Sequence, residues 1–240
     1  MAVLSGLDGT ITFAAGYTIL ARGWTMSINA APQDLTPINP TWDHQKLLNT
    51  ALLQSAAGSY GCRLGVGTTA LLNAGAGEYD TFPEEWTLTQ TCEAREVTVL
   101  GAAWRTYVAG LKSTSFEMVS YVDGIQALPL ANRADTAILT TDAGRFYTVP
   151  YVVIGQDSGV DVDDTQRRVV TSCAATDRPV ATGGLPLTGD FGVATFFAGG
   201  TNRKYVCDIL VTGVVVNVNR AVSVGSVGIS FVANGVVQAF

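Results

Sequence analysis

The sequence predicts a mainly β protein of the α+β kind: an antiparallel β-sandwich or barrel with one flanking α-helix and long loops. Three observations predict this fold. Apolar and polar residues alternate with a period of two along much of the C-terminal third. Val, Ile, Thr, Phe and Tyr are frequent in such stretches, and they suit a pleated, half-buried surface. The 26 glycines supply the many turns that a chain of short strands needs.

Predicted strands run through the whole chain. The clearest are the alternating stretches Val214–Arg220 and Ala221–Phe231, whose glycines indicate a bend or a bulge. Asn234 and Gly235 follow them and predict a tight turn near the C-terminus. Further strands are expected, in chain order, at Thr10–Phe13, Tyr17–Ile28, Glu96–Leu100, Ser115–Val122, Ala137–Thr141, Phe146–Ile154, Arg167–Ser172, Phe191–Phe197 and Lys204–Leu210.

One segment has the composition of an α-helix. Thr41–Ala57 is rich in helix formers, Thr41 or Asp43 can cap its start, and Gly58 can end it. Residues 35–86 around it form a long excursion of loop and helix, rich in Gly, Ala and Thr after residue 58. No repeat with a period of 20–50 residues and no linker divides the chain, so the sequence predicts a single domain over residues 1–240.

Composition and charge exclude several classes of protein. Hydrophobic residues make up 48% of the chain and charged residues only 14%, against a usual charged share of about 25%. We therefore expect a partner to cover part of the surface. The net charge of −6 has the wrong sign for a protein that grips nucleic acid. No signal sequence is evident, and the most apolar run, Ile209–Val216, is too short to cross a bilayer, which predicts a protein made in the cytoplasm without membrane insertion.

The sequence predicts no catalytic residues, no cofactor and no metal site. The single histidine, His44, has no partner in a recognisable nucleophile motif and is interpreted as part of a surface helix. Gly65–Ala70 matches a relaxed dinucleotide-binding pattern, but no clear strand precedes it and no helix follows. Four cysteines lack metal-ligand spacing and are expected to be small buried residues: Cys62, Cys92, Cys173 and Cys207.

Acidic residues gather in two clusters. One consists of Glu78, Asp80, Glu84 and Glu85, and the other of Asp157, Asp161, Asp163 and Asp164. The second cluster lacks the spacing and the terminal Glu of an EF-hand. Paired carboxylates could also serve glycoside hydrolysis, and a solvated loop is the simplest interpretation of each cluster.

Three stretches together resemble the major tail tube protein of long-tailed bacteriophages. Gly16–Ile28 is similar to the first hairpin of that family, with its glycine–tryptophan strand. Arg95–Asp123 is the best match: a strand with Thr98, a connection ending in Gly-Leu-Lys at residue 112, and a strand closing on Tyr-x-Asp. Val227–Val237 resembles the terminal strand and turn. The long stretch from Leu35 to Trp86 departs from the family pattern.

This resemblance implies a structural virion protein rather than an enzyme. Its subunits would form hexameric rings that stack into the tail tube, a negatively lined conduit for DNA ejection. The implied partners are further copies of the chain, the tape measure protein, the tail terminator and baseplate proteins, and double-stranded DNA that passes through without specific binding. The implied location is the virion tail, and the host cytoplasm during assembly.

Two surfaces follow as expectations for such a tube. Because a conduit must not hold DNA, one or both acidic clusters are expected to line or rim the channel. The excursion is expected to touch the next ring, with these candidate contact residues: Gly65, Gly67, Leu71, Leu72, Gly75 and Gly77. Three alternatives stay open: another virion component such as a tail terminator or head-decoration protein, a carbohydrate-active β-protein that uses clustered Asp and Glu, and an adhesive surface domain.

Overall fold

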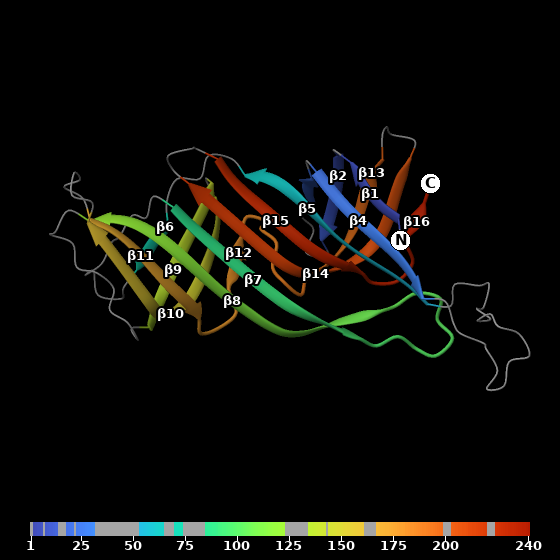
Figure 1. Ribbon diagram of the computed structural model, residues 1–240, viewed down its shortest axis with the longest axis horizontal. Helices are drawn as coiled ribbons and strands as arrows, with labels where there is room; N and C mark the ends of the chain where they lie inside the picture. The colour runs from blue at the N-terminus through green and yellow to red at the C-terminus, as the bar shows by residue number, and fades with distance from the viewer. Residues whose placement is uncertain are drawn as a thin grey trace, which may run out of the picture.

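The structure is a computed structural model, and it describes residues 2–6, 8–13, 18–21, 23–31, 53–64, 70–73, 85–122, 134–142, 144–160, 167–198, 203–219 and 224–240. Within these ranges all regular secondary structure is β-strand, and neighbouring strands pair antiparallel. Figure 1 shows an elongated, strongly twisted molecule. The predicted mainly β, antiparallel fold is confirmed, and the sheet formed by the described strands runs from β1 to β6 without closing into a barrel.

Sixteen strands follow one another along the described parts of the chain. Their bounds are β1 Ala2–Gly6, β2 Asp8–Phe13, β3 Thr18–Ala21, β4 Gly23–Ala31, β5 Leu53–Leu64, β6 Ala70–Asn73, β7 Glu85–Glu96, β8 Tyr107–Val122, β9 Ala134–Asp142, β10 Arg145–Val160, β11 Arg167–Ala175, β12 Val180–Thr182, β13 Phe191–Phe197, β14 Lys204–Asn219, β15 Val224–Ala233 and β16 Gln238–Ala239. The main path of the sheet is β1-β4-β5-β15-β14-β7-β8-β11-β10-β9-β6.

The strands form two units that repeat one pattern of pairing. In the first unit the order is β2-β13-β14-β15-β5-β4. In the second unit it is β6-β9-β10-β11-β8-β7. Each unit combines strands from the N-terminal half of the chain with strands from the C-terminal half. In Figure 1 the first unit takes the centre and right of the molecule, while β6, β9, β10 and β11 of the second unit lie at the left and its β7–β8 hairpin runs through the centre to the right.

The registers of the β4–β5 and β7–β8 pairs show that the two units correspond residue by residue. Trp24 of β4 pairs with Tyr60 of β5, and Trp86 of β7 pairs with Met118 of β8. A shift of 62 residues thus carries β4 onto β7, and a shift of 58 carries β5 onto β8. Both tryptophans are buried.

The C-terminal hairpins repeat in the same way. A shift of 58 residues carries the β10–β11 hairpin onto the β14–β15 hairpin, together with its β-bulge after Val153, which becomes the bulge after Val211. The small strands β12 and β16 also pair at equivalent positions, on β10 and β14 respectively. The chain therefore contains an internal structural duplication.

The two units join where β14 of the first pairs with β7 of the second. One edge of β14 carries β13 along residues 204–210 and then β7 along residues 213–219. Gly213 lies at the bulge between these two stretches, where the strand changes partner. This junction makes the two units one continuous sheet.

Aromatic side chains fill the core of the first unit. The Trp24 ring lies 4.9 Å from the ring of Phe196 on β13, and Phe196 stacks on Phe231 of β15 at 5.5 Å. Since β2 and β3 lie against β4 and β5, these rings are enclosed between two layers. In the second unit, Phe116 of β8 packs edge-on against Tyr151 of β10 at 5.3 Å.

The flanking helix predicted at 41–57 is wrong wherever the structure describes that segment. Residues 53–64 form β5, which pairs with β4 on one side and β15 on the other. Two rows of cross-strand hydrogen bonds outweigh the high helix propensity of Leu, Gln and Ala there. Residues 70–73, expected within a loop, form β6 on the edge of β9. Residues 41–52 lie outside the described residues.

Most of the other predicted strands are confirmed. Seven of them lie within observed strands, and they begin at Thr10 in β2, Ser115 in β8, Ala137 in β9, Phe146 in β10, Arg167 in β11, Phe191 in β13 and Lys204 in β14. The strand predicted at Glu96–Leu100 is wrong, since β7 ends at Glu96. The tight turn predicted at Asn234 and Gly235 is wrong, because β15 and β16 follow one another along the same edge of β14 without a reversal of the chain. The backbone only bends there, with a positive φ of 115° at Gly235 that suits glycine.

Candidate functional site

One face of the central sheet is exposed and carries mostly small polar side chains. Eight strands lie side by side in it: β4, β5, β15, β14, β7, β8, β11 and β10. Their opposite face is buried, as at Trp86, Leu88 and Val216. The exposed side, which we call the polar face, includes Thr25, Ser27, Asn29, Ser59, Ser226, Gly228, Ser230, Val215, Asn217, Glu85, Thr87, Thr89, Thr91, Ser113, Ser115, Glu117, Arg168, Val170, Ser172, Asp157 and Gly159.

Several polar groups of this face bond to one another across neighbouring strands. The hydroxyls of Thr91 and Ser113 lie 2.7 Å apart, and those of Thr25 and Ser59 lie 3.0 Å apart. The Thr87 hydroxyl donates to Asn217 Oδ1 at 2.9 Å, across the junction of the two units. Donors used in this way are less available to a molecule that slides over the face.

Charge on the polar face is sparse and mostly negative. Among the described side chains it consists of four carboxylates, Glu85, Glu93, Glu117 and Asp157, and two guanidiniums, Arg95 and Arg168, of which Arg95 pairs with Glu93 at 3.1 Å. Asn219 Nδ2 donates a hydrogen bond to Glu85 Oε1 at the junction. The face therefore offers little positive charge to a phosphate backbone.

Two of the eight acidic residues singled out in the sequence lie on this face. Glu85 begins β7, and Asp157 is exposed on β10. The other six lie outside the described residues: Asp161, Asp163, Asp164, Glu78, Asp80 and Glu84. Strands β8 and β11 separate Glu85 from Asp157, which corresponds to about 14 Å at the usual strand spacing. That separation exceeds what the two-carboxylate chemistry of glycoside hydrolysis requires.

The predicted inter-ring loop is described only in part. Leu71 and Leu72 belong to β6, whose backbone pairs with Ile138 and Ala137 of β9. Gly65, Gly67, Gly75 and Gly77 lie outside the described residues.

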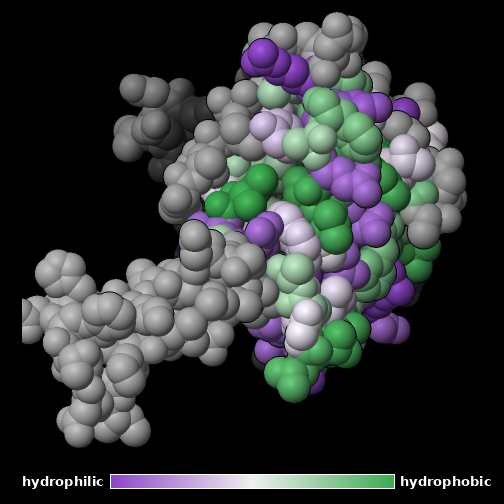
Figure 2. All heavy atoms as spheres, turned by 90° about the vertical axis from the view of Figure 1, so that its right-hand side faces the viewer, coloured by the Kyte–Doolittle hydropathy of each residue, from purple (hydrophilic) through white to green (hydrophobic). Residues whose placement is uncertain are grey.

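The end of the β7–β8 hairpin carries an apolar surface that the sequence pattern does not predict. Five large apolar side chains are exposed there, and we call them the hairpin tip: Val97, Val99, Leu100, Val108 and Leu111. Leu100 is fully exposed and Val99 is 73% exposed. In Figure 1 this hairpin extends to the right-hand end of the molecule, and Figure 2 shows hydrophobic residues on the surface at that end. Hydrogen bonds tie the connection between β7 and β8 to the start of β5, with Gln54 N–H donating to Ala103 O and Arg105 N–H donating to Gln54 O, both at 2.8 Å.

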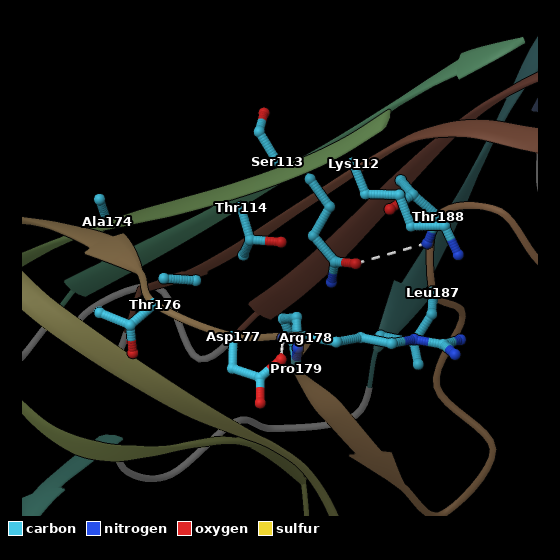
Figure 3. Close-up of a pocket in the computed structure, with 12 residues that line it drawn as sticks. Lys112, Ser113, Thr114, Ala174, Thr176, Asp177, Arg178, Pro179, Leu187 and Thr188 are labelled. Carbon is cyan, nitrogen blue, oxygen red and sulfur yellow. Dashed lines mark hydrogen bonds between the residues drawn. The ribbon is translucent and has the colours of Figure 1, made fainter. Parts of the chain in front are cut away.

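A pocket of about 410 Å³ opens beside the junction, between β7, β8 and the chain after β11. Gln90 lines it, and its Oε1 accepts a hydrogen bond from the backbone N–H of Thr188 at 3.4 Å (Figure 3). Lys112 and Arg178 also line it, and Arg178 lies 3.5 Å from Asp190. Among the residues described, no three His, Cys, Asp or Glu side chains gather as a metal site.

Three of the cysteines whose side chains the structure describes are free and buried: Cys92, Cys173 and Cys207. Burial raises the pKa of Cys173 from 9.0 to about 12. Burial, and secondarily the negative charge of Asp208, raises the pKa of Cys207 to about 12. The thiols of Cys173 and Cys207 therefore stay protonated near neutral pH and act as core side chains.

No helix in the described ranges is long and apolar enough to cross a membrane. No protein-family model matches this chain, and neither does any curated protein.

Proposed function

We propose that this chain is a tail tube protein of a long-tailed bacteriophage. Copies join into rings, whose six-fold character is implied by the resemblance, and the rings stack into a conduit through which DNA leaves the capsid. The tube first encloses the tape measure protein and ends at the terminator and baseplate proteins. The polar face carries this proposal: one exposed sheet surface, eight strands wide, with small polar side chains and few charges.

A surface of this kind suits a wall past which DNA must slide. Each exposed cation on such a wall contributes about 0.2–1 kcal/mol of attraction to a phosphate, and the attraction is multiplied over every copy in the tube. Among the described side chains of the polar face the cations are Arg95, which pairs with Glu93, and Arg168, which lies on the same face as Asp157 and Glu117. We therefore propose that this face lines the channel.

The hairpin tip supports contact with another copy. Monomeric proteins rarely expose several large apolar side chains on one projecting segment. A neighbouring subunit or ring that covers Val99 and Leu100 would remove this surface from water.

Negative-stain electron microscopy of the purified protein at increasing concentration tests the assembly. Stacked rings or tubes support the proposal, and a chain that stays monomeric at high concentration and in intact particles contradicts it. Rings that do not stack favour a terminator or decoration protein instead.

A charge substitution tests which face lines the channel. Ser115→Lys adds a cation to the polar face, and Val180→Lys adds one at an exposed position outside both the polar face and the hairpin tip as the matched control. Assembled Ser115→Lys protein is expected to retain duplex DNA with a steep salt dependence, whereas an assembly of the control retains less. Equal retention by both variants would contradict a lumen formed by the polar face.

A further inference from the structure

The junction inside the chain shows how two units join edge to edge. Residues 213–219 of β14 pair with β7, with Val214 opposite Gln90 and Val218 opposite Trp86. This contact links the first unit to the second, and it keeps the buried and polar faces continuous across the join. Because the units are equivalent residue by residue, the same contact is possible wherever the matching edges are open.

One of the matching edges lies at the far end of the second unit. Gly155–Val160 of β10 is equivalent to Gly213–Val218 of β14, and among the described strands it pairs with β11 alone. β9 accompanies β10 only as far as Val152, just as β13 accompanies β14 only as far as Leu210. No strand among the described residues occupies the place beside Gly155–Val160 that β7 holds beside β14.

The other matching edge belongs to β4, which is the equivalent of β7. It is occupied by β1, a five-residue strand. Ala2 lies opposite Ile28 and Gly6 opposite Trp24, which is the register of Val214 and Val218 on β7. β1 thus stands where a β14-like strand stands at the junction.

We propose that Gly155–Val160 of one copy displaces β1 of the next copy and pairs antiparallel with its β4, in the register of the internal junction. Asp157 then lies opposite Ser27, and Val160 lies opposite Trp24 of the neighbouring copy. The contact is head to tail, because a different edge of each copy takes part, and repeated copies close into a ring. This inference rests on the proposed self-assembly and adds the strands and the register that produce it.

Two features of the open edge favour this partner. A strand edge without a partner can pair with a further strand. The equivalent edge of β14 already pairs with β7, so the β7-like strand β4 of another copy is the matching partner for Gly155–Val160. The incoming strand also continues the polar face, since Asp157 and Gly159 lie on that face of β10 as Val215 and Asn217 do on β14.

A pair of cysteines in the proposed register tests the contact. In Ser27→Cys/Asp157→Cys the two Cα atoms are expected about 4.5–5.5 Å apart across the copies, which suits a disulfide. Oxidation of the assembling protein should give a covalent ladder, and mixed isotope-labelled chains should show that residues 27 and 157 come from different copies.

Two control pairs bracket the result. Thr89→Cys/Val215→Cys occupies the equivalent positions of the internal junction and should form an intrachain disulfide in the monomer. Failure of this pair would overturn the register on which the inference rests. Gly23→Cys/Asp157→Cys places the thiols four residues out of register, about 13 Å apart along the strand, and should give no ladder.

The remaining outcomes separate this inference from the proposed function. Tubes that form without a 27–157 cross-link overturn the inference and leave the tail tube proposal standing. A dominant 157–157 cross-link overturns it in favour of a two-fold pairing of β10 with itself. Removal of residues 2–6 should promote assembly, because it opens the β4 edge. A folded chain of that kind which never assembles contradicts both proposals.

Discussion

Gly58 on β5 offers a test of how closely β4, β5 and β15 are packed. A Cβ atom at this position would overlap the Thr25 carbonyl oxygen of β4 and lie 2.7 Å from Cζ of Phe231. The carbonyl belongs to a paired strand and cannot move without disturbing the register of β4 on β5. Gly58→Ala is therefore expected to be destabilising, although alanine is normally the better residue inside a strand.

The magnitude follows from two opposing terms. Replacing glycine by alanine recovers about 0.5–1 kcal/mol of backbone entropy. Overpacking of a filled site costs about 1–3 kcal/mol. The free energy of unfolding should fall by about 1–2 kcal/mol. Gly228 of β15 is the matched control, since the nearest atom to a Cβ added there would be the Val215 carbonyl oxygen at 4.0 Å. Gly228→Ala should be neutral or slightly stabilising.

Urea unfolding followed by tryptophan fluorescence measures both variants, with the slope checked for a two-state transition. Equal stability of Gly58→Ala and Gly228→Ala would contradict the close packing described at Gly58. Combining Gly58→Ala with Phe231→Leu separates the two contacts. If the phenylalanine ring is the main obstacle, the double variant loses less than the sum of the singles. If the carbonyl is the main obstacle, the two losses add.

Three further outcomes are expected. Leu100→Asp on the hairpin tip should weaken assembly, measured by sedimentation, while leaving the free energy of unfolding within the usual range of surface changes, about 0.5 kcal/mol. Tyr147→Phe removes the hydrogen bond from the buried phenol to the Pro186 carbonyl at 2.9 Å and should cost about 1–3 kcal/mol in urea unfolding. Burial raises the pKa of Cys173 and Cys207 to about 12, so as the pH rises above 9 the unfolded chain releases their protons before the folded chain does, and the free energy of unfolding should fall. Alkylation of both buried thiols at pH 8 should require unfolding.

The sequence was most informative where one face of a strand is buried and the other is wet. The alternation around Val214–Val218 predicts a strand because every second residue enters the core, and β14 has this pattern. The acidic residues Glu85 and Asp157 were chosen for charge alone, and the structure places both on the polar face. Their common face depends on the order of strands, which periodicity does not encode.

The strand β5 illustrates why other elements escaped prediction. Its Leu, Gln and Ala residues favour a helix locally, and the strand is decided by β4 and β15, which come from distant parts of the chain. The duplication escaped for a different reason. Its spacing of about 60 residues is longer than the 20–50-residue periods typical of repeat proteins, and few identical residues remain between the two units. The recurrence of Trp24 and Trp42 as Trp86 and Trp104, at one spacing, was the available signal.

The number of chains in a ring follows from the same duplication. Eight strands of the polar face, about 4.8 Å apart, contribute about 38 Å of circumference per chain. Three chains then enclose a bore of about 37 Å between backbones, and six chains enclose one of about 73 Å. Strand tilt widens both values.

The bore of about 37 Å suits a conduit for a single DNA duplex. Small side chains such as Ser115 and Thr89 leave room for the duplex, and the wall stays close to its surface. We therefore expect the six-fold character of the resembled family to reside in units, with two units per chain and three chains per ring. Native mass spectrometry of isolated rings measures this number directly. Rings of six chains would mean that only one unit of each chain lines the channel. The proposed pairing of β10 with β4 of the next copy would then not close the ring.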